Sequence, residues 1–215
     1  MMQKRKTVDF SVALGLFDYI NPVFYAVTSI TIAVHLHGAA SPAVFALYAL
    51  GALVSLFFGL AIPTVKLLVG LGRMPFKMPV NLVAFVNSGI LLSGLMLFAA
   101  VLHPPVPALA GILAVILILL GLVYGKTKKA NTIAVLTGAF GYILIYAAMI
   151  VFSLRSGALL PVVLYGIAIL LFIALCLIGM RADLKDARIH WVIEISNVLC
   201  QLCVMLATLL SFGIL

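Results

Sequence analysis

The sequence predicts an all-α, polytopic membrane protein with seven transmembrane helices, its N-terminus in the cytoplasm and its C-terminus outside. Hydrophobic residues make up 66% of the chain and charged residues only 8%, and the mean hydropathy is +1.36. Soluble domains lie far from these values. Seven apolar runs of about twenty residues each match the length needed to cross a bilayer. We expect residues 1–215 to form a single seven-helix bundle.

The distribution of positive charge sets the predicted orientation. When the seven apolar runs are threaded back and forth, twelve of the thirteen Lys and Arg residues fall on one side and only Arg155 falls on the other. Short loops rich in Lys and Arg stay in the cytoplasm. We therefore expect a multi-pass protein of the cytoplasmic membrane, in a prokaryotic cell. The same bias accounts for the net charge of +8, so the expected partners are membrane lipids and not nucleic acid.

The first predicted span covers residues 8–34 and carries a polar stripe. Its polar residues recur at steps of three, four and three, which places them on one face of a helix. They are Asp18, Asn21, Tyr25 and Thr28. Pro22 lacks a backbone N–H, so we expect the helix to kink there and to free a carbonyl group toward the interior. The span is too long and too polar for a cleaved signal sequence.

The second predicted span, residues 43–69, combines a ridge of small residues with one buried cation. Gly51, Ser55 and Gly59 recur every four residues, a pattern that allows close approach of another helix or of a second protomer. A homodimer is compatible with this ridge. Lys66 lies near the cytoplasmic end, where its long side chain either pairs with an acid or reaches the interface.

The next four predicted spans alternate between polar and apolar character. The third span, 79–102, and the fifth, 131–153, each begin with polar residues in the inner half of the bilayer. These residues are Asn81, Asn87 and Ser88 in the third span and Asn131, Thr137 and Tyr142 in the fifth. The fourth span, 105–124, and the sixth, 158–180, are almost entirely apolar, so we expect both to face lipid.

The seventh predicted span, residues 189–213, carries the strongest signal. Four polar residues recur at steps of four, three and four and so share one helix face. They are His190, Glu194, Asn197 and Gln201. An ionisable group in hydrocarbon costs several kcal/mol, so this stripe is expected to face the bundle interior or a wet cavity. A functional role is the default for Glu194, and a buried ion pair with Lys66 or His190 is the structural alternative.

These stripes together predict a polar cavity in the cytoplasmic half, walled by the first, second, third, fifth and seventh spans. Interhelical hydrogen bonding is the structural alternative for each single amide or hydroxyl. The candidate substrate-binding residues are Asp18, Asn21, Lys66, Asn81, Asn87, Asn131, His190, Glu194, Asn197 and Gln201.

No motif identifies a cofactor, a metal or an enzyme class. His35, His37 and His103 fall at the outer ends of predicted helices. No carboxylate or cysteine that could complete a ligand set lies near them in the sequence, so no metal site is predicted. The sequence has no HExxH, no phosphate-binding loop and no GxSxG. No cofactor is expected.

Three functions fit these observations. The first is a small transporter or permease that binds a polar or cationic solute, with Glu194 and Asp18 supplying charge for the solute or for a coupling proton. The second is a membrane-embedded enzyme acting on a lipid or isoprenoid head group, with Glu194 and His190 as acid and base and Lys66 or Arg188 holding a phosphate. The third is a noncatalytic sensor or accessory subunit. The nearly apolar outer halves of the spans favour an enzyme or a closed, inward-facing transporter.

Overall fold

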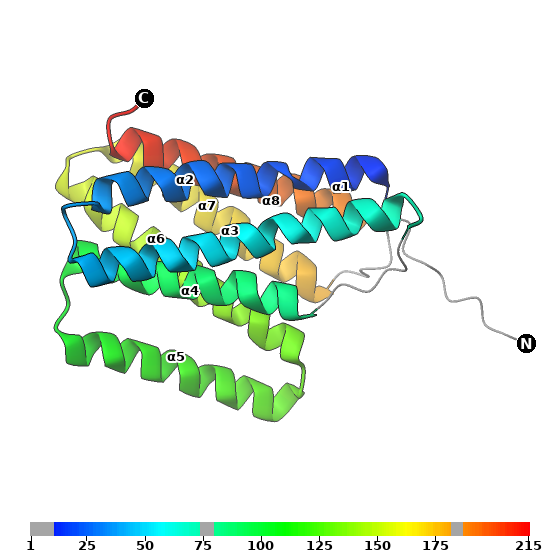
Figure 1. The fold of residues 1–215 in the computed structure, drawn as a ribbon, viewed down its shortest axis with the longest axis horizontal. Coiled ribbons are helices and arrows are strands. Elements are labelled where there is room, and N and C mark those ends of the chain that lie inside the picture. The colour runs from blue at the N-terminus through cyan, green and yellow to red at the C-terminus, as the bar shows by residue number, and fades with distance from the viewer. Residues whose placement is uncertain (1–10, 74–79, 182–186) are drawn as a thin grey trace, which may run out of the picture.

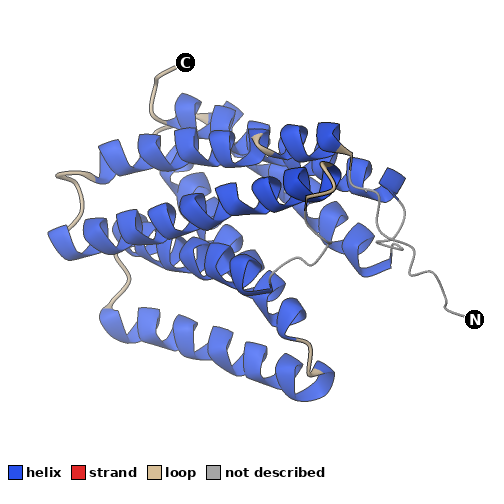
Figure 2. Ribbon diagram, turned by 45° about the vertical axis from the view of Figure 1, so that its right-hand side comes forward, coloured by secondary structure: helices blue, strands red, loops and turns tan. Residues whose placement is uncertain are grey.

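The computed structural model describes residues 11–73, 80–181 and 187–215. Within these residues all regular secondary structure is helical, and seven spans are long and apolar enough to cross a membrane (Figure 2). The predicted all-α class and the number of spans are confirmed. Several charged residues used in the sequence argument lie outside the described residues, namely Lys4, Arg5, Lys6, Asp9, Lys77, Asp183, Lys185 and Asp186.

In the described residues, eight helices build the seven spans, and their ends agree with the predicted ends to within a few residues. They are α1 (Val12–Asp18), α2 (Ile20–Leu36), α3 (Pro42–Gly70), α4 (Val80–Leu102), α5 (Val106–Thr127), α6 (Ala130–Arg155), α7 (Leu159–Arg181) and α8 (Ala187–Ser211).

The first span is interrupted, as the proline predicted. Helix α1 ends at Asp18, Tyr19 forms a turn, and α2 begins at Ile20. Pro22 has no N–H to donate to the carbonyl group of Asp18 four residues earlier, so the helical hydrogen-bond pattern cannot run through this point. The break places Asp18 and Asn21 on either side of the turn, and both side chains are buried.

The helices form a bundle with one peripheral member. Helix α4 packs between α3 and α6, α2 packs against α3 and α8, and α7 packs against α8. Helix α5 packs mainly on α6 and lies at one edge of the bundle (Figure 1), as expected for the fourth span. Helix α7 leaves most of its apolar residues exposed or half-buried, as expected for the sixth span, and packs on α8 through one face, where Tyr165 has no exposed surface.

Glycines set the closest helix contacts. A Cβ atom on Gly51 of α3 would lie 2.7 Å from the carbonyl oxygen of Gly89 on α4. A Cβ atom on Gly94 of α4 would lie 2.5 Å from the carbonyl oxygen of Gly141 on α6. The small-residue ridge predicted on the second span is therefore used inside the chain, where backbones approach closely. Gly59, the last member of that ridge, has open space in front of it.

Candidate functional site

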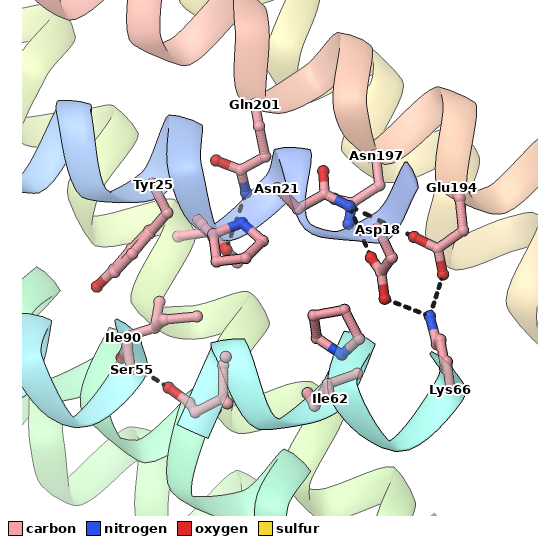
Figure 3. Close-up of a pocket in the computed structure, with 15 residues that line it drawn as sticks. Asp18, Asn21, Tyr25, Ser55, Ile62, Lys66, Ile90, Glu194, Asn197 and Gln201 are labelled. Carbon is pink, nitrogen blue, oxygen red and sulfur yellow. Dashed lines mark hydrogen bonds and ion pairs between the residues drawn. The ribbon is translucent and has the colours of Figure 1, made fainter. Parts of the chain in front are cut away.

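Three ionisable residues from three spans meet inside the bundle. The Nζ atom of Lys66 on α3 donates to Oδ2 of Asp18 at 2.7 Å, and it also donates to Oε1 of Glu194 on α8 (Figure 3). All three residues are buried, with exposed fractions of 5% for Asp18, 8% for Lys66 and 6% for Glu194. The buried ion pair with Lys66, one of the structural alternatives considered for Glu194, is present.

An asparagine closes this cluster into a ring. The Nδ2 atom of Asn21 donates to Oδ1 of Asp18 at 2.9 Å and, over a longer distance of 3.4 Å, to Oε2 of Glu194. All four carboxylate oxygens therefore accept a hydrogen bond, two from Lys66 and two from Asn21. Buried charges persist in proteins when they are paired and hydrogen-bonded in this way. We call Asp18, Asn21, Lys66 and Glu194 the polar ring.

The polar ring forms one wall of a cavity of about 200 Å³. This ring cavity is lined by residues of the first, second, third, fifth and seventh spans, which are the five spans predicted to wall a cavity. The residues beyond the polar ring are Pro22, Tyr25, Ser55, Gly59, Ile62, Pro63, Val86, Ile90, Tyr142, Asn197 and Gln201.

Hydrogen-bonding capacity remains unused in the lining. Among the described residues, two buried side-chain atoms have no hydrogen-bond partner, Oδ1 of Asn21 and the hydroxyl of Tyr25. Both residues line the ring cavity. Gln201 donates from Nε2 to the hydroxyl of Tyr142 at 3.0 Å, which leaves its carbonyl oxygen as an acceptor. Buried polar atoms without partners are rare in folded proteins and are one mark of a site where a ligand or water binds.

The structure brings six of the ten candidate site residues to this cavity and places four elsewhere. Asn81 and Asn131 are exposed in the first turns of α4 and α6, and His190 is half-buried but not part of the lining. Asn87 packs against Gly138 between α4 and α6. Successive helical residues are rotated by about 100°, so the residue just before Asn87, Val86, faces the cavity in its place.

Nine of the fifteen lining residues were absent from the predicted set, and three of them, Tyr25, Ser55 and Ile90, show what the sequence could and could not reveal. Tyr25 continues the stripe of Asp18 and Asn21, one turn further along α2, and its pattern alone was sufficient to find it. Ser55 was interpreted as a packing residue, and its hydroxyl does donate to the carbonyl oxygen of Val86 at 2.9 Å. Ile90 is apolar, and no sequence feature distinguished it from its neighbours.

Two further cavities follow the ring cavity along the same helices. A central void of about 10 Å³ shares Tyr25, Tyr142 and Gln201 with the ring cavity. A far cavity of about 450 Å³ lies at the other end of the bundle. On each of α2, α4 and α6, a residue that lines the far cavity lies four positions after a residue that lines the central void, about 6 Å further along the helix. These residue pairs are Ile32 and Leu36, Ser93 and Leu97, and Ile145 and Met149.

Polar pairs continue into this second half of the bundle. The hydroxyls of Tyr165 and Thr208 lie 2.8 Å apart, as do those of Ser153 and Ser211. The half that was expected to be almost apolar therefore holds buried hydrogen-bonded pairs.

Histidines at this end do not assemble a metal site among the described residues. His35 and His103 line the far cavity, whereas His37 lines a separate surface pocket. No group of three His, Cys, Asp or Glu side chains suited to a metal ion occurs in the described part of the chain.

Comparison with known proteins gives no match to a family model, to a curated protein or to a solved structure.

Proposed function

We propose that this protein is a small membrane permease that binds a small polar or cationic solute in the ring cavity and passes it along the bundle axis. The observation that supports this proposal best is the succession of three cavities on the same helices. A polar ring buried in a membrane bundle is costly, and ionisable residues at such depth commonly mark a solute or ion pathway. The ring cavity is the binding site in this proposal.

An apolar wall closes the route in the state described. Leu36, Leu97 and Met149 line the far cavity one helical turn beyond residues of the central void, and Leu97 and Met149 are almost completely buried. In this proposal these three side chains form the barrier between the two cavities. Transporters alternate between states that open the site to one side at a time, by movement of one group of helices against another. The conformation described here is the one closed toward the far cavity, and transport requires these three side chains to separate.

We propose further that the ring cavity faces the cytoplasm of a cell with this protein in its cytoplasmic membrane. Lys66 lies four residues before the end of α3 at Gly70, and Glu194 lies seven residues after the start of α8 at Ala187. The described Lys and Arg residues of the loops gather at this same end of the bundle, apart from Arg155. By the positive-inside rule this end is cytoplasmic.

The enzyme alternative has less support from the geometry. It requires Glu194 and His190 to act together as acid and base, yet His190 does not line the ring cavity. It also requires a free carboxylate, whereas both oxygens of Glu194 already accept hydrogen bonds. A noncatalytic accessory subunit would have no need for a cavity with unused polar atoms.

Binding and flux measurements on purified protein test the permease proposal. Thermal midpoints in detergent would be measured against a panel of small cations and polar metabolites, because a ligand of the folded state raises the midpoint by mass action. Any hit would then be tested for uptake into proteoliposomes. Glu194→Gln removes one ring charge with little change in shape, and Gly111→Ala on the lipid-facing surface of α5, where a Cβ atom has open space, is the matched control.

We expect a hit that the Glu194→Gln variant loses and the Gly111→Ala variant keeps, together with saturable uptake by wild type. Binding with no uptake in proteoliposomes of either orientation would contradict transport and leave the enzyme as the better hypothesis. The absence of any ligand, combined with a Glu194→Gln variant at least as stable as wild type, would favour the accessory subunit.

A further inference from the structure

The ammonium group of Lys66 lies where a cationic ligand would bind. Its Nζ atom lies between two carboxylates, donates to both, and lines the ring cavity with them. With all three groups ionised, Asp18, Lys66 and Glu194 together carry one net negative charge. The site is therefore electrically suited to a second positive charge, while the only cation within reach of the two acids among the described residues is tethered to α3.

The amide of Asn21 has one defined orientation, and this orientation leaves an acceptor for a ligand. Only the nitrogen of the amide can donate to Asp18 and Glu194, because a carboxylate oxygen does not donate. The amide oxygen must then be Oδ1, which is buried and has no partner. Asn21 is 9% exposed and lines the ring cavity. A bound molecule with an N–H or O–H group would supply the missing donor.

Other acceptors border the same space. The carbonyl oxygen of Gln201 is left over after its Nε2 donates to Tyr142, and the hydroxyl of Tyr25 has no partner. Asn197 also lines the cavity, one turn from Gln201 on α8. A cavity with a net negative charge and several free acceptors suits a small cation that has several N–H donors.

We propose that the ring cavity binds a small primary ammonium compound, and that this ligand displaces the ammonium group of Lys66 from Asp18 and Glu194. Lys66 is a tethered competitor that occupies the site when no ligand is present. This inference rests on the proposed function, since it names the solute class of the same cavity. No bond is formed or broken; one ammonium group replaces another on the same carboxylates.

When a ligand displaces it, the ammonium group of Lys66 can move to the membrane interface. Lys66 lies one turn before the end of α3 at Gly70, and its four-carbon side chain is flexible. Lysines near the ends of membrane helices extend their charge to the interface. An arginine at this position has a rigid guanidinium and a larger head group, so its side chain would leave the two carboxylates less easily than lysine does. Displacement also couples ligand binding to a change in the contacts between α3, α1 and α8.

A variant that removes the competitor but keeps the net charge tests this proposal. Lys66→Met/Asp18→Asn retains one net negative charge on Glu194, as in wild type, and has no tethered ammonium. Methylammonium chloride is the probe, with tetramethylammonium chloride at equal ionic strength as the control, because it carries the same charge without an N–H donor. The apparent dissociation constant is obtained from the shift of the thermal midpoint with ligand concentration.

We expect methylammonium to bind the double variant about tenfold or more tightly than wild type, because a tethered competitor acts at an effective concentration of order millimolar or above. Asp18→Asn alone keeps the competitor and loses a charge, so its affinity should fall below that of wild type. Two results would overturn the proposal. One is equal affinity of wild type and the double variant for methylammonium. The other is an equal shift of the thermal midpoint by methylammonium and by tetramethylammonium.

A second variant, Lys66→Ala, tests the same proposal in case the double variant does not fold. Lys66→Ala removes three carbons and the ammonium group, which together correspond to n-propylammonium. We expect n-propylammonium to raise the thermal midpoint of Lys66→Ala more than that of wild type, and 1-propanol to have no such effect. A Lys66→Ala protein that n-propylammonium does not stabilise would contradict the inference.

The inference and the proposed function fail in different ways. Ammonium binding with the expected variant pattern, but no flux in proteoliposomes, would support the ligand class and overturn the permease. Uptake of an uncharged solute that depends on Glu194, without ammonium binding, would support the permease and overturn the ligand class.

Discussion

The Nζ atom of Lys66 lies 2.7 Å from Oδ2 of Asp18, although the two residues are 48 positions apart in the chain. The approach of α1 to α3 explains this contact. A Cβ atom on Gly15 would lie 2.8 Å from the backbone nitrogen of Leu67, the residue next to Lys66. Gly15 precedes Asp18 by three residues and lies on the same side of α1. The missing side chain of Gly15 thus allows Asp18 to reach Lys66.

Gly15→Ala should weaken this contact. The added methyl group meets backbone atoms of α3, which cannot move aside as a flexible side chain could, and overpacking of this kind typically costs about 1–3 kcal/mol. We expect a lower free energy of unfolding and weaker binding of any ligand found for the ring cavity. Denaturant unfolding in detergent, with Gly111→Ala as the control, measures the first effect. Wild-type stability in Gly15→Ala would show that α1 and α3 are not held in this close contact.

Lys66→Met should be strongly destabilising because it leaves two buried carboxylates without their cation. Breaking a buried ion pair by removal of one partner typically costs about 3–5 kcal/mol. Replacement of all three groups, in Asp18→Asn/Lys66→Met/Glu194→Gln, removes the unpaired charges and should recover most of this loss. Unfolding free energies of the two variants test the idea. If the triple variant were no more stable than Lys66→Met, lost packing and not unpaired charge would explain the effect.

Sequence periodicity was sufficient for the two spans that carry most of the polar ring. On α1–α2 and α8 several polar residues recur at helical spacing, so the face that avoids lipid is defined by Asp18 and Asn21 in one and by Glu194 and Asn197 in the other. Periodicity gives no such answer for α4 and α6. Their few polar residues do not recur along one helix face. An asparagine in such a span can line the cavity, as expected for Asn87, or pack in a helix interface, as found.

Hydrogen-bonded pairs between different helices could not be predicted from the sequence. Tyr165 is a single polar residue in an otherwise apolar stretch, and Thr208 continues the polar stripe of α8 seven residues after Gln201. Neither pattern indicates the other residue as its partner. Only the packing of α7 on α8 shows that their hydroxyls are 2.8 Å apart. The outer half is almost apolar in composition, as expected, but composition did not show that its few polar side chains pair with one another. A polar side chain counts toward a buried network only when its partner is known.

The proposed orientation predicts which loop residues a membrane-impermeant maleimide can reach. The chain has three free cysteines within spans, Cys176, Cys200 and Cys203, so alanine replacements give a background without thiols. In intact cells we expect labelling of Ser156→Cys, at the far end of the bundle, and none of Lys128→Cys at the basic end. Both positions are exposed. Permeabilised cells should label both, and the reverse pattern in intact cells would invert the topology.

Met149→Ala should open the wall between the central void and the far cavity. Met149 has no exposed surface and lines the far cavity beside Leu97, so its truncation leaves space where the route is closed. Such a change in a core costs about 2–5 kcal/mol of stability. In proteoliposomes we expect faster leak of the solute identified by the binding screen, persisting in the presence of Glu194→Gln because an open path needs no binding site.

Met205→Ala is the matched control for this leak. It removes the same side chain from α8 at a half-buried position that lines none of the three cavities. Vesicle integrity is checked with entrapped sucrose, which intact vesicles retain. If Met149→Ala and Met205→Ala leaked equally, loss of stability would account for the leak. The barrier to permeation would then have to lie at another point along the three cavities, most directly at Tyr25 and Tyr142, where the ring cavity meets the central void.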